Sequence, residues 1–240
     1  MSSRNFYSTG NILQYNELKK KAGLNSRDEL SEALKIILSD FKSKGDSTEI
    51  PNDANINSEN LDRKELKIAV KVLLSKLDPT NLREAFDRVF EVLNTEVIES
   101  LVVHLEKEET GDNILPVLQN LWKVLEEYHN NKRLVSIGVS DVDTDKFIQF
   151  YNWANIKPNI IQINLATCCV VPPALQEFTK QNDIQLLTHS DPDPIITKES
   201  LTEFFGEQTE LNWVVRYQVH VKCRGVLSAK GYLIHINRSS

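Results

Sequence analysis

The sequence predicts an α/β fold built on a parallel sheet. Three short apolar runs, at residues 134–139, 160–165 and 184–187, are rich in Val, Ile and Leu. Each is too short for a helix and is typical of a strand buried on both faces. The two segments between the runs have helical spacing. Strand, helix, strand, helix, strand in this order indicates right-handed crossovers and therefore parallel strands.

The two helices between these strands have recognisable ends. Asp143 or Thr144 can cap the first helix, and Pro158 stops it. Pro172 and Pro173 open the second helix, because proline fits the first turn without losing a needed N–H. These signals place both helices without reference to any known protein.

The first part of the chain contains one clear helix and one polar segment. The spacing predicts a helix over 25–44, with Ser26 as its cap, Glu29 completing a capping box and Gly45 at its end. Turn-forming residues dominate 46–62, so we expect a flexible surface loop there.

The alternation of strands and helices continues up to the three apolar runs. Strands are expected at 66–74 and 97–105. Helices are expected at 79–94, with Thr80 as the cap, and at 115–128. The alternation of strands and helices therefore runs from 66 into the strand that begins at 134.

Composition limits the class of protein and of partner. The 240 residues suffice for one α/β barrel of about 250 residues or for two small domains. The net charge of −6 argues against nucleic acid or an anionic membrane as a partner. No signal-peptide core and no long apolar run is visible, and three cysteines do not make a disulfide framework. We therefore expect a cytoplasmic protein.

Several motifs together carry a family resemblance. The segments SIGVSD at 136–141, PNIIQINLATCC at 158–169 and IQLLTH at 184–189 resemble strands five to seven of an aldo-keto reductase barrel. Within that superfamily, the Cys-Cys pair followed by Pro-Pro is similar to the regulatory (modifier) subunits of glutamate–cysteine ligase. TGNIL at 9–13 and VKCRGVLSAKGY at 221–232 are further signs of that family.

The resemblance implies a single (β/α)8 TIM-type barrel of aldo-keto reductase type over 1–240, with an eroded second strand and a truncated C-terminal end. It also implies a helix at 211–222 and the eighth strand at 225–228. The residues of 211–222 leave another structure open, because apolar and polar side chains alternate as in a half-exposed strand. We follow the family here, since a parallel barrel places a helix at this point.

The resemblance also implies which residues a reductase site would need. Aldo-keto reductases reduce carbonyls with NADPH, using Asp, Tyr, Lys and His, and the lysine lowers the pKa of the tyrosine that gives the proton. Lys71 matches the lysine and His104 matches the histidine, but no tyrosine occurs from 24 to 70, where the family has one. We expect both residues to be vestigial. An active reductase would require another tyrosine, such as Tyr15, to reach Lys71.

The same two residues also have purely structural interpretations. Lys71 can be a lysine that extends from a strand end toward water. His104 and His189 both follow apolar runs, so they can face each other across the top of the barrel as structural histidines.

Neither a cofactor nor a metal ion is expected. Reductases of the family grip the adenosine phosphate with a P-K-S segment, where this chain has Ser228-Ala229-Lys230. No G-x-G-x-x-G motif or P-loop replaces it. The aspartates after residue 140 lack the Gly and Glu of a calcium loop and are better explained as helix caps.

The three cysteines leave two alternatives. Cys168 and Cys169 are adjacent, which is poor geometry for a mutual disulfide and lacks zinc-site spacing. Each cysteine can be a small buried hydrophobe. Alternatively, Cys168 and Cys169, at the barrel face whose loops carry function, form a redox-sensitive link to a partner protein, with Cys223 nearer the opposite face.

The expected function follows from the resemblance. Regulatory subunits of this family have no catalytic activity and form a heterodimer with the catalytic subunit of glutamate–cysteine ligase, improving glutamate use and relieving feedback inhibition by glutathione. The alternatives are an NADPH-dependent aldo-keto reductase acting on a small carbonyl compound and a free-standing redox-sensing barrel.

Overall fold

The computed structural model describes residues 5–21, 23–44, 61–106, 114–166 and 170–238. The predicted loop at 46–62 lies outside these ranges, except for its last two residues. The division of the chain into one domain stays a prediction.

Five parallel strands form one half of the sheet and follow each other in chain order. They are β2 (Leu66–Leu74), β3 (Ile98–Leu105), β4 (Leu134–Ser140), β5 (Ile160–Asn164) and β6 (Gln185–His189). All four pairings between neighbours are parallel. The strands predicted from the apolar runs are therefore confirmed.

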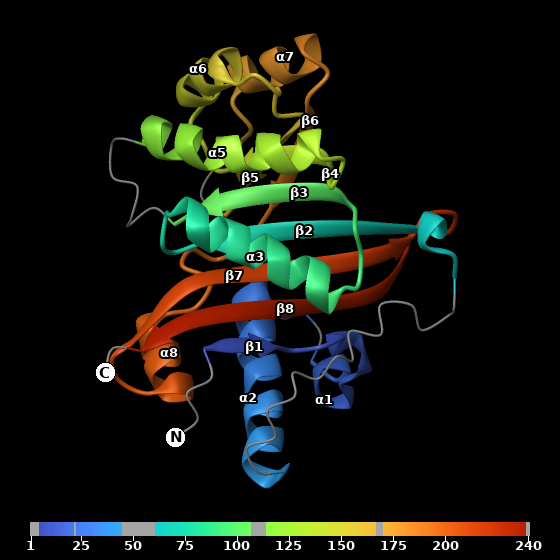
Figure 1. Cartoon of the computed structure of the whole chain (residues 1–240), viewed down its shortest axis with the longest axis vertical. Coiled ribbons are helices and arrows are strands. Elements are labelled where there is room, and N and C mark those ends of the chain that lie inside the picture. Colours follow the sequence, from blue (N-terminus) through green and yellow to red (C-terminus); the bar gives the residue numbers. More distant parts are fainter. Residues whose placement is uncertain (1–4, 22, 45–60, 107–113, 167–169, 239–240) are drawn as a thin grey trace.

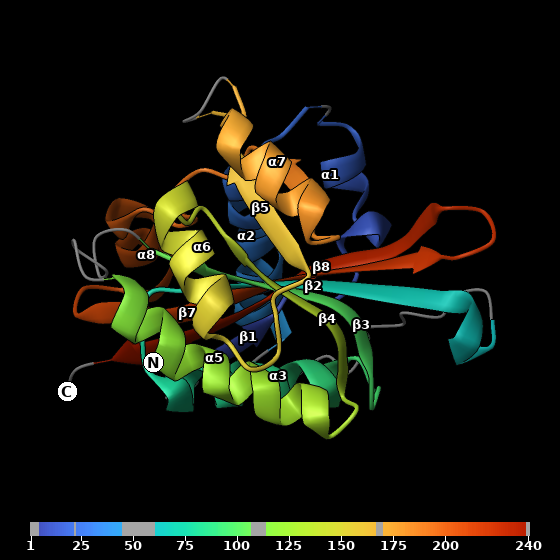
Figure 2. The same cartoon turned by 90° about the horizontal axis from the view of Figure 1, so that it is seen from above.

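Four helices connect these strands. They are α3 (Pro79–Val92), α5 (Ile114–Asn130), α6 (Thr144–Trp153) and α7 (Pro173–Gln181). Their apolar stripes pack with alternate residues of the strands into the larger core. Figure 2 shows α3 and α5 on one side of the sheet, and α1 (Asn16–Lys19) and α2 (Ser26–Lys44) on the other.

The other sheet face carries a second core. It contains Leu73 and Val214, whereas their chain neighbours Val72 and Val215 belong to the larger core, as the alternation of side chains along a strand requires. The helices α2 and α8 pack against this face. The remaining helical segments are α2 (Ser26–Lys44), α8 (Lys198–Phe205), α1 (Asn16–Lys19) and the 3-10 turns Ile12–Gln14 and Arg63–Glu65.

Two helix caps differ from the sequence prediction. Asp78, rather than Thr80, caps α3, because its carboxylate accepts a 2.6 Å hydrogen bond from the Thr80 N–H. Asn25, rather than Ser26, caps α2, because its side-chain oxygen accepts from the Asp28 N–H at 2.9 Å. In both cases the acceptor precedes the predicted residue, and Asp and Asn are among the strongest caps.

The C-terminal part of the chain forms antiparallel strands. The order β1-β8-β7-β2 places β7 (Thr209–Val221) and β8 (Val226–Arg238) between β2 and the short strand β1 (Phe6–Ser8). The helix predicted at 211–222 is therefore wrong, and the eighth strand is longer than 225–228. The apolar residues of β7 that alternate with polar ones are almost fully buried, which a helix of this sequence would not achieve.

The position of β7 explains the difference from the family pattern. It pairs antiparallel with β2 along the whole strand, from Leu66 opposite Val221 to Leu74 opposite Trp213. The resemblance places the eroded second barrel strand at this edge of β2, so β7 occupies its place. The strand order ends at β1 and β6, and no pairing joins these two strands within the described ranges. The sheet fits a truncated (β/α)8 barrel that is not closed (Figure 1).

Candidate functional site

Lys71 lies at the centre of a buried group of charges. It is on β2, and its Nζ atom is 2.8 Å from Oδ2 of Asp191, which follows β6. Arg216 on β7 lies opposite Lys71 in the sheet and also binds Asp191. Its two terminal nitrogens contact the two carboxylate oxygens, one of them at 3.0 Å. One carboxylate therefore pairs with two cations, and all three are held by different strands or by the loop after β6.

Burial and charge oppose each other in this group. Burial raises the pKa of Asp191, but His189, Arg216 and Lys71 together hold it far below its usual range. Burial lowers the pKa of Lys71, and the Asp191 carboxylate only partly offsets this effect. Both charge contacts therefore favour the ionised form of Asp191, and its carboxylate is the group that holds the Lys71 ammonium in this buried position.

Asp141 is the centre of a second group. Its Oδ2 atom is 3.0 Å from His189 Nε2 and 3.0 Å from His104 Nδ1. The His104 contact is electrostatic, since buried Nδ1 has no aligned hydrogen-bond partner. On the other side of the ring, His104 Nε2 is 3.8 Å from Asp193. The structure thus brings the two histidines to one carboxylate, as their positions after two strands predict.

The pKa values of this second group move in opposite directions. Burial raises the pKa of Asp141, but contacts with His104, His189 and Ser140 outweigh it and hold the pKa far below its usual range. Burial lowers the pKa of both histidines, yet the Asp141 carboxylate, with a second aspartate beside each ring, raises both above the ordinary value. Asp141 therefore stabilises protonated imidazoles, and it is not the helix cap that the sequence suggested.

Ser140 completes an arrangement that has the composition of a nucleophile, base and acid. Its hydroxyl is 3.2 Å from His189 Nε2, and His189 Nδ1 is 3.2 Å from Asp191 Oδ2. However, the hydroxyl donates its hydrogen to Asp141 at 2.7 Å, and Ser140 is buried. An activated serine needs a neutral histidine to accept its proton. The set is therefore a closed hydrogen-bond network and not a nucleophilic centre.

A tyrosine that could act with Lys71 is not found among the described contacts. The Tyr15 hydroxyl donates to the Thr9 carbonyl oxygen, and burial raises its pKa. The Tyr232 hydroxyl donates to Glu29 at 2.6 Å, and burial again raises its pKa. Both tyrosines have acceptors of their own, so the pairing of Tyr15 with Lys71 that a reductase would require is not formed.

Ser228 and Lys230, which match the phosphate-binding segment of reductases, are not positioned to bind a phosphate. Lys230 Nζ is 2.6 Å from Glu29 Oε1, and the Ser228 hydroxyl donates to the Val219 carbonyl at 3.1 Å. Both lie on the antiparallel strand β8. A cation already paired with a carboxylate and a hydroxyl bonded within the hairpin are poor ligands for an adenosine phosphate.

The cysteines and the metal prediction can be placed only in part. Cys223 is exposed in the turn between β7 and β8, so of the two alternatives for the cysteines the buried hydrophobe is wrong for Cys223. This turn lies at the end of the sheet where β2 begins. Cys168 and Cys169 lie outside the described residues. Within the described ranges, no three His, Cys, Asp or Glu side chains are grouped to hold a metal ion.

Sequence reasoning missed two residues of the site. Asp191 directly follows a strand, which is where barrel folds place functional side chains, and this signal could have identified it. Arg216 was assigned to a helix. Its position between two buried residues of a strand pattern places it on the opposite sheet face from them, and only the register with β2 shows that this face also carries Lys71.

Comparison with known proteins agrees with the resemblance. The model of the aldo/keto reductase family matches residues 44–192. The glutamate–cysteine ligase regulatory subunit of Rattus norvegicus is 34% identical over 250 residues, which cover 96% of this chain and 91% of the rat protein. The Homo sapiens protein of the same name has the same identity and coverage. The chain belongs to the family of glutamate–cysteine ligase regulatory subunits.

Solved structures of aldo-keto reductases are similar to this regulatory-subunit chain in part. The reductase MGS-M4 from a Medee basin deep-sea metagenome library has a TM-score of 0.45 and 20% identity. The match covers 56% of this chain and 48% of the reductase. Separately, no helix in the described part of the chain is long and apolar enough to cross a membrane.

Proposed function

We propose that this chain is a non-catalytic regulatory subunit that binds the catalytic subunit of glutamate–cysteine ligase. Relatives that carry this name align over 96% of the chain, which is the observation that carries the proposal. The site agrees with this proposal, because Tyr15 and Tyr232, the tyrosines that could act with Lys71, donate to other acceptors.

The regulatory effect needs only a modest difference in binding free energy. A subunit that binds one conformation of its partner better than another shifts the partner toward that conformation. A coupling free energy of about 1 to 3 kcal/mol changes a ligand's affinity by roughly 5- to 150-fold. In this proposal, the favoured conformation binds glutamate better and glutathione more weakly, and the complex is a cytoplasmic heterodimer.

The reductase alternative has weaker support. It needs an acid beside Lys71, and the tyrosines Tyr15 and Tyr232 have other acceptors. It also needs a phosphate grip, and Lys230 is paired with Glu29. Both halves of the reductase chemistry are therefore poorly supported by the described residues.

The test is the rate of ligation by the cognate catalytic subunit, titrated with this chain at low glutamate, with and without glutathione. The proposal predicts a saturable rise near one-to-one stoichiometry, a lower KM for glutamate and weaker inhibition by glutathione. A catalytically active aldo-keto reductase of similar size is the control for nonspecific protein effects. An unchanged rate together with no complex on a sizing column would contradict the proposal.

A further inference from the structure

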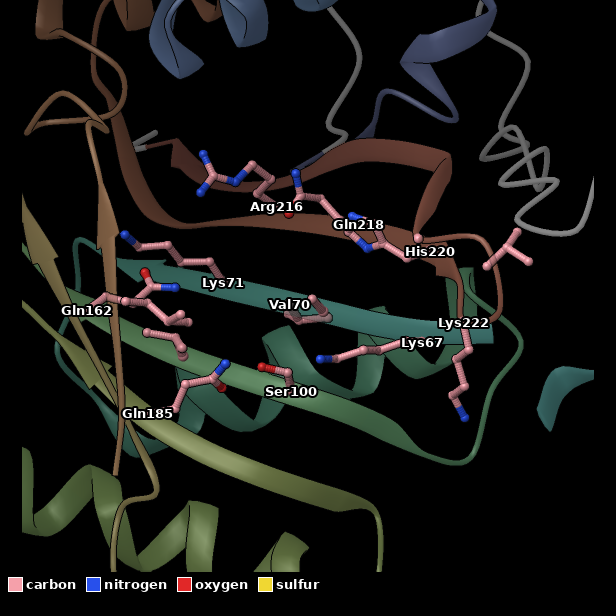
Figure 3. A pocket seen from close by; sticks show the side chains of 15 residues that line it. Lys67, Val70, Lys71, Ser100, Gln162, Gln185, Arg216, Gln218, His220 and Lys222 are labelled. Carbon is pink, nitrogen blue, oxygen red and sulfur yellow. The ribbon is translucent and has the colours of Figure 1, made fainter. Parts of the chain in front are cut away.

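A pocket lies on the same sheet face as Lys71, toward the amino-terminal ends of the parallel strands. Its volume is about 390 Å³, which is within the usual range for small-molecule sites. Lys67 and Lys71 of β2 lie along one side, and Arg216, Gln218 and His220 of β7 face the same space (Figure 3). In a closed barrel this face would be interior. Here the open sheet makes it accessible.

The lining of the pocket is basic in a chain whose overall charge is negative. Five of its lining residues are Lys, Arg or His, and none is Asp or Glu, although the chain carries a net charge of −6. A concave surface lined by one sign of charge concentrates ligands of the opposite sign. The composition therefore selects for an anion.

The cations of the pocket differ in how far they are already neutralised. Lys71 and Arg216 share Asp191 at the inner end. Lys222 Nζ donates to a backbone carbonyl at 2.9 Å and is 3.8 Å from the Glu99 carboxylate. Lys67 makes no ion pair with any described residue. The outer part of the pocket therefore keeps an excess of positive charge.

The direction of the His220 pKa shift agrees with this excess of positive charge. Burial lowers the pKa of His220, and the nearby Lys67 ammonium lowers it further. A carboxylate close by would act in the opposite direction. The environment of His220 is thus positive, as the absence of acidic residues from the lining indicates.

Neutral hydrogen-bonding side chains in the pocket further limit the kind of ligand that fits. Ser100, Gln162, Gln185 and Gln218 also line the pocket. The side-chain oxygen of Gln162 is buried and has no hydrogen-bond partner among the described residues. Buried acceptors are normally satisfied, so a ligand that donates a hydrogen bond would complete this one. A hydroxyl group beside the anionic groups of the ligand would supply this donor.

We propose that this pocket binds a small hydroxylated anion that carries carboxylate or phosphate groups. Lys67 and Lys222 would meet the charge, His220 would donate a hydrogen bond from its ring N–H, and Gln162 would accept from a hydroxyl. The pocket extends from Lys71 and Arg216 toward the amino-terminal ends of the strands, and its lining residue Gln162 lies beside Asp141, whose N–H donates to the Gln162 carbonyl oxygen. The regulatory function proposed above rests on the relatives and not on this pocket, so either proposal can fail without the other.

The experiment is isothermal titration calorimetry of the full chain at low ionic strength with two anionic probes. Citrate represents hydroxylated carboxylates and glucose 6-phosphate represents hydroxylated phosphates, while glucose is the neutral control. The inference predicts saturable one-site binding of at least one anion and none of glucose. The probe that binds more tightly identifies the anionic group.

Variants at an exposed position test the location of the site. Lys67→Gln should weaken binding about threefold and Lys67→Glu about tenfold or more, since one cation is removed or reversed. The matched controls are Lys123→Gln and Lys123→Glu, at an exposed position on α5 that is not part of the pocket lining. Equal losses at both positions, or no saturable binding of either anion, would overturn the inference.

Discussion

Two charged regions on one sheet face differ in how their charges are balanced. In the inner region, Lys71 and Arg216 both bind the Asp191 carboxylate, and the side chains are largely buried. In the outer region, Lys67 and His220 line a pocket to which no carboxylate contributes. A buried charge must be paired because its desolvation is costly, whereas an exposed charge is solvated by water and stays available to bind a ligand. The comparison separates charges that hold the fold together from charges that are available for binding.

The largest expected effect is at the shared carboxylate of the inner region. Asp191→Asn leaves two buried cations facing each other, so we expect a loss of about 3 to 5 kcal/mol in the free energy of unfolding. Urea unfolding followed by tryptophan fluorescence measures it. Lys67→Gln, in the outer region, should change the same quantity by less than about 0.5 kcal/mol. Similar losses for both variants would remove the distinction between the regions.

A smaller loss is expected at Asp141. Asp141→Asn removes the carboxylate between His104 and His189. A histidine, unlike the Arg216 guanidinium that Asp191→Asn leaves without its carboxylate, can lose its proton near neutral pH and so avoid an unpaired buried charge. We therefore expect a loss of about 2 to 3 kcal/mol by urea unfolding. A loss as large as that of Asp191→Asn would show that the histidines cannot adapt in this way.

The pH dependence of stability tests whether Asp141 stabilises the protonated forms of His104 and His189. The pKa values of His104 and His189 are raised in the folded chain. Their contribution is therefore complete below the unfolded pKa of about 6.5 and is lost as pH rises through the folded values. The pKa values of Asp141 and Asp191 are lowered, so their contribution is lost as pH falls below about 4.

We expect the free energy of unfolding to fall between pH 6 and pH 8. This should be measured by urea unfolding at several pH values, with Asp141→Asn as the comparison. The variant lacks the carboxylate that stabilises the protonated rings, so its profile should be flatter in this range. A wild-type profile that is already flat there would contradict the assigned protonation of the histidines.

The smallest effect is expected at the hairpin turn. Cys223 is exposed there. Cys223→Ser should change the free energy of unfolding by less than about 0.5 kcal/mol. A larger loss, measured in the same urea experiment, would mean that the thiol is packed.

A redox link through Cys168 and Cys169 stays a prediction. Replacing both with serine should weaken association with the catalytic subunit under oxidising conditions and leave it unchanged under reducing conditions. Sizing chromatography of the mixed subunits can measure both. Equal association of variant and wild type in the two conditions would exclude the link.

The parallel half of the fold was predictable because its strands are apolar runs with no competing pattern. The segment that forms β7 carried two conflicting signals. Its period of two indicated a strand, and the family indicated a helix. The strand formed because the edge of β2 had no second strand to pair with, and β7 satisfies its backbone groups. An eroded element thus changed the structure of a segment far away in the sequence.

The site was predictable where the family resemblance or the end of an apolar run marked a residue, as for Lys71, His104 and His189. Lys71 and His104 could be placed by their motifs, but their partners could not. Asp191 is 120 residues from Lys71 in the sequence, and Arg216 lies on the strand that was taken for a helix. Pairing between distant residues depends on the sheet register, which a single sequence does not specify.

We propose that Lys71 and His104 no longer perform reductase chemistry and that the chain instead acts on the catalytic subunit of glutamate–cysteine ligase. The most direct test is the KM for glutamate of the catalytic subunit at saturating wild-type chain and at saturating His104→Gln, once the variant is shown to be folded and bound. The account predicts that both lower the KM for glutamate equally. A bound, folded variant that no longer lowers it would contradict the account, because His104 would then be needed for function and not only for structure.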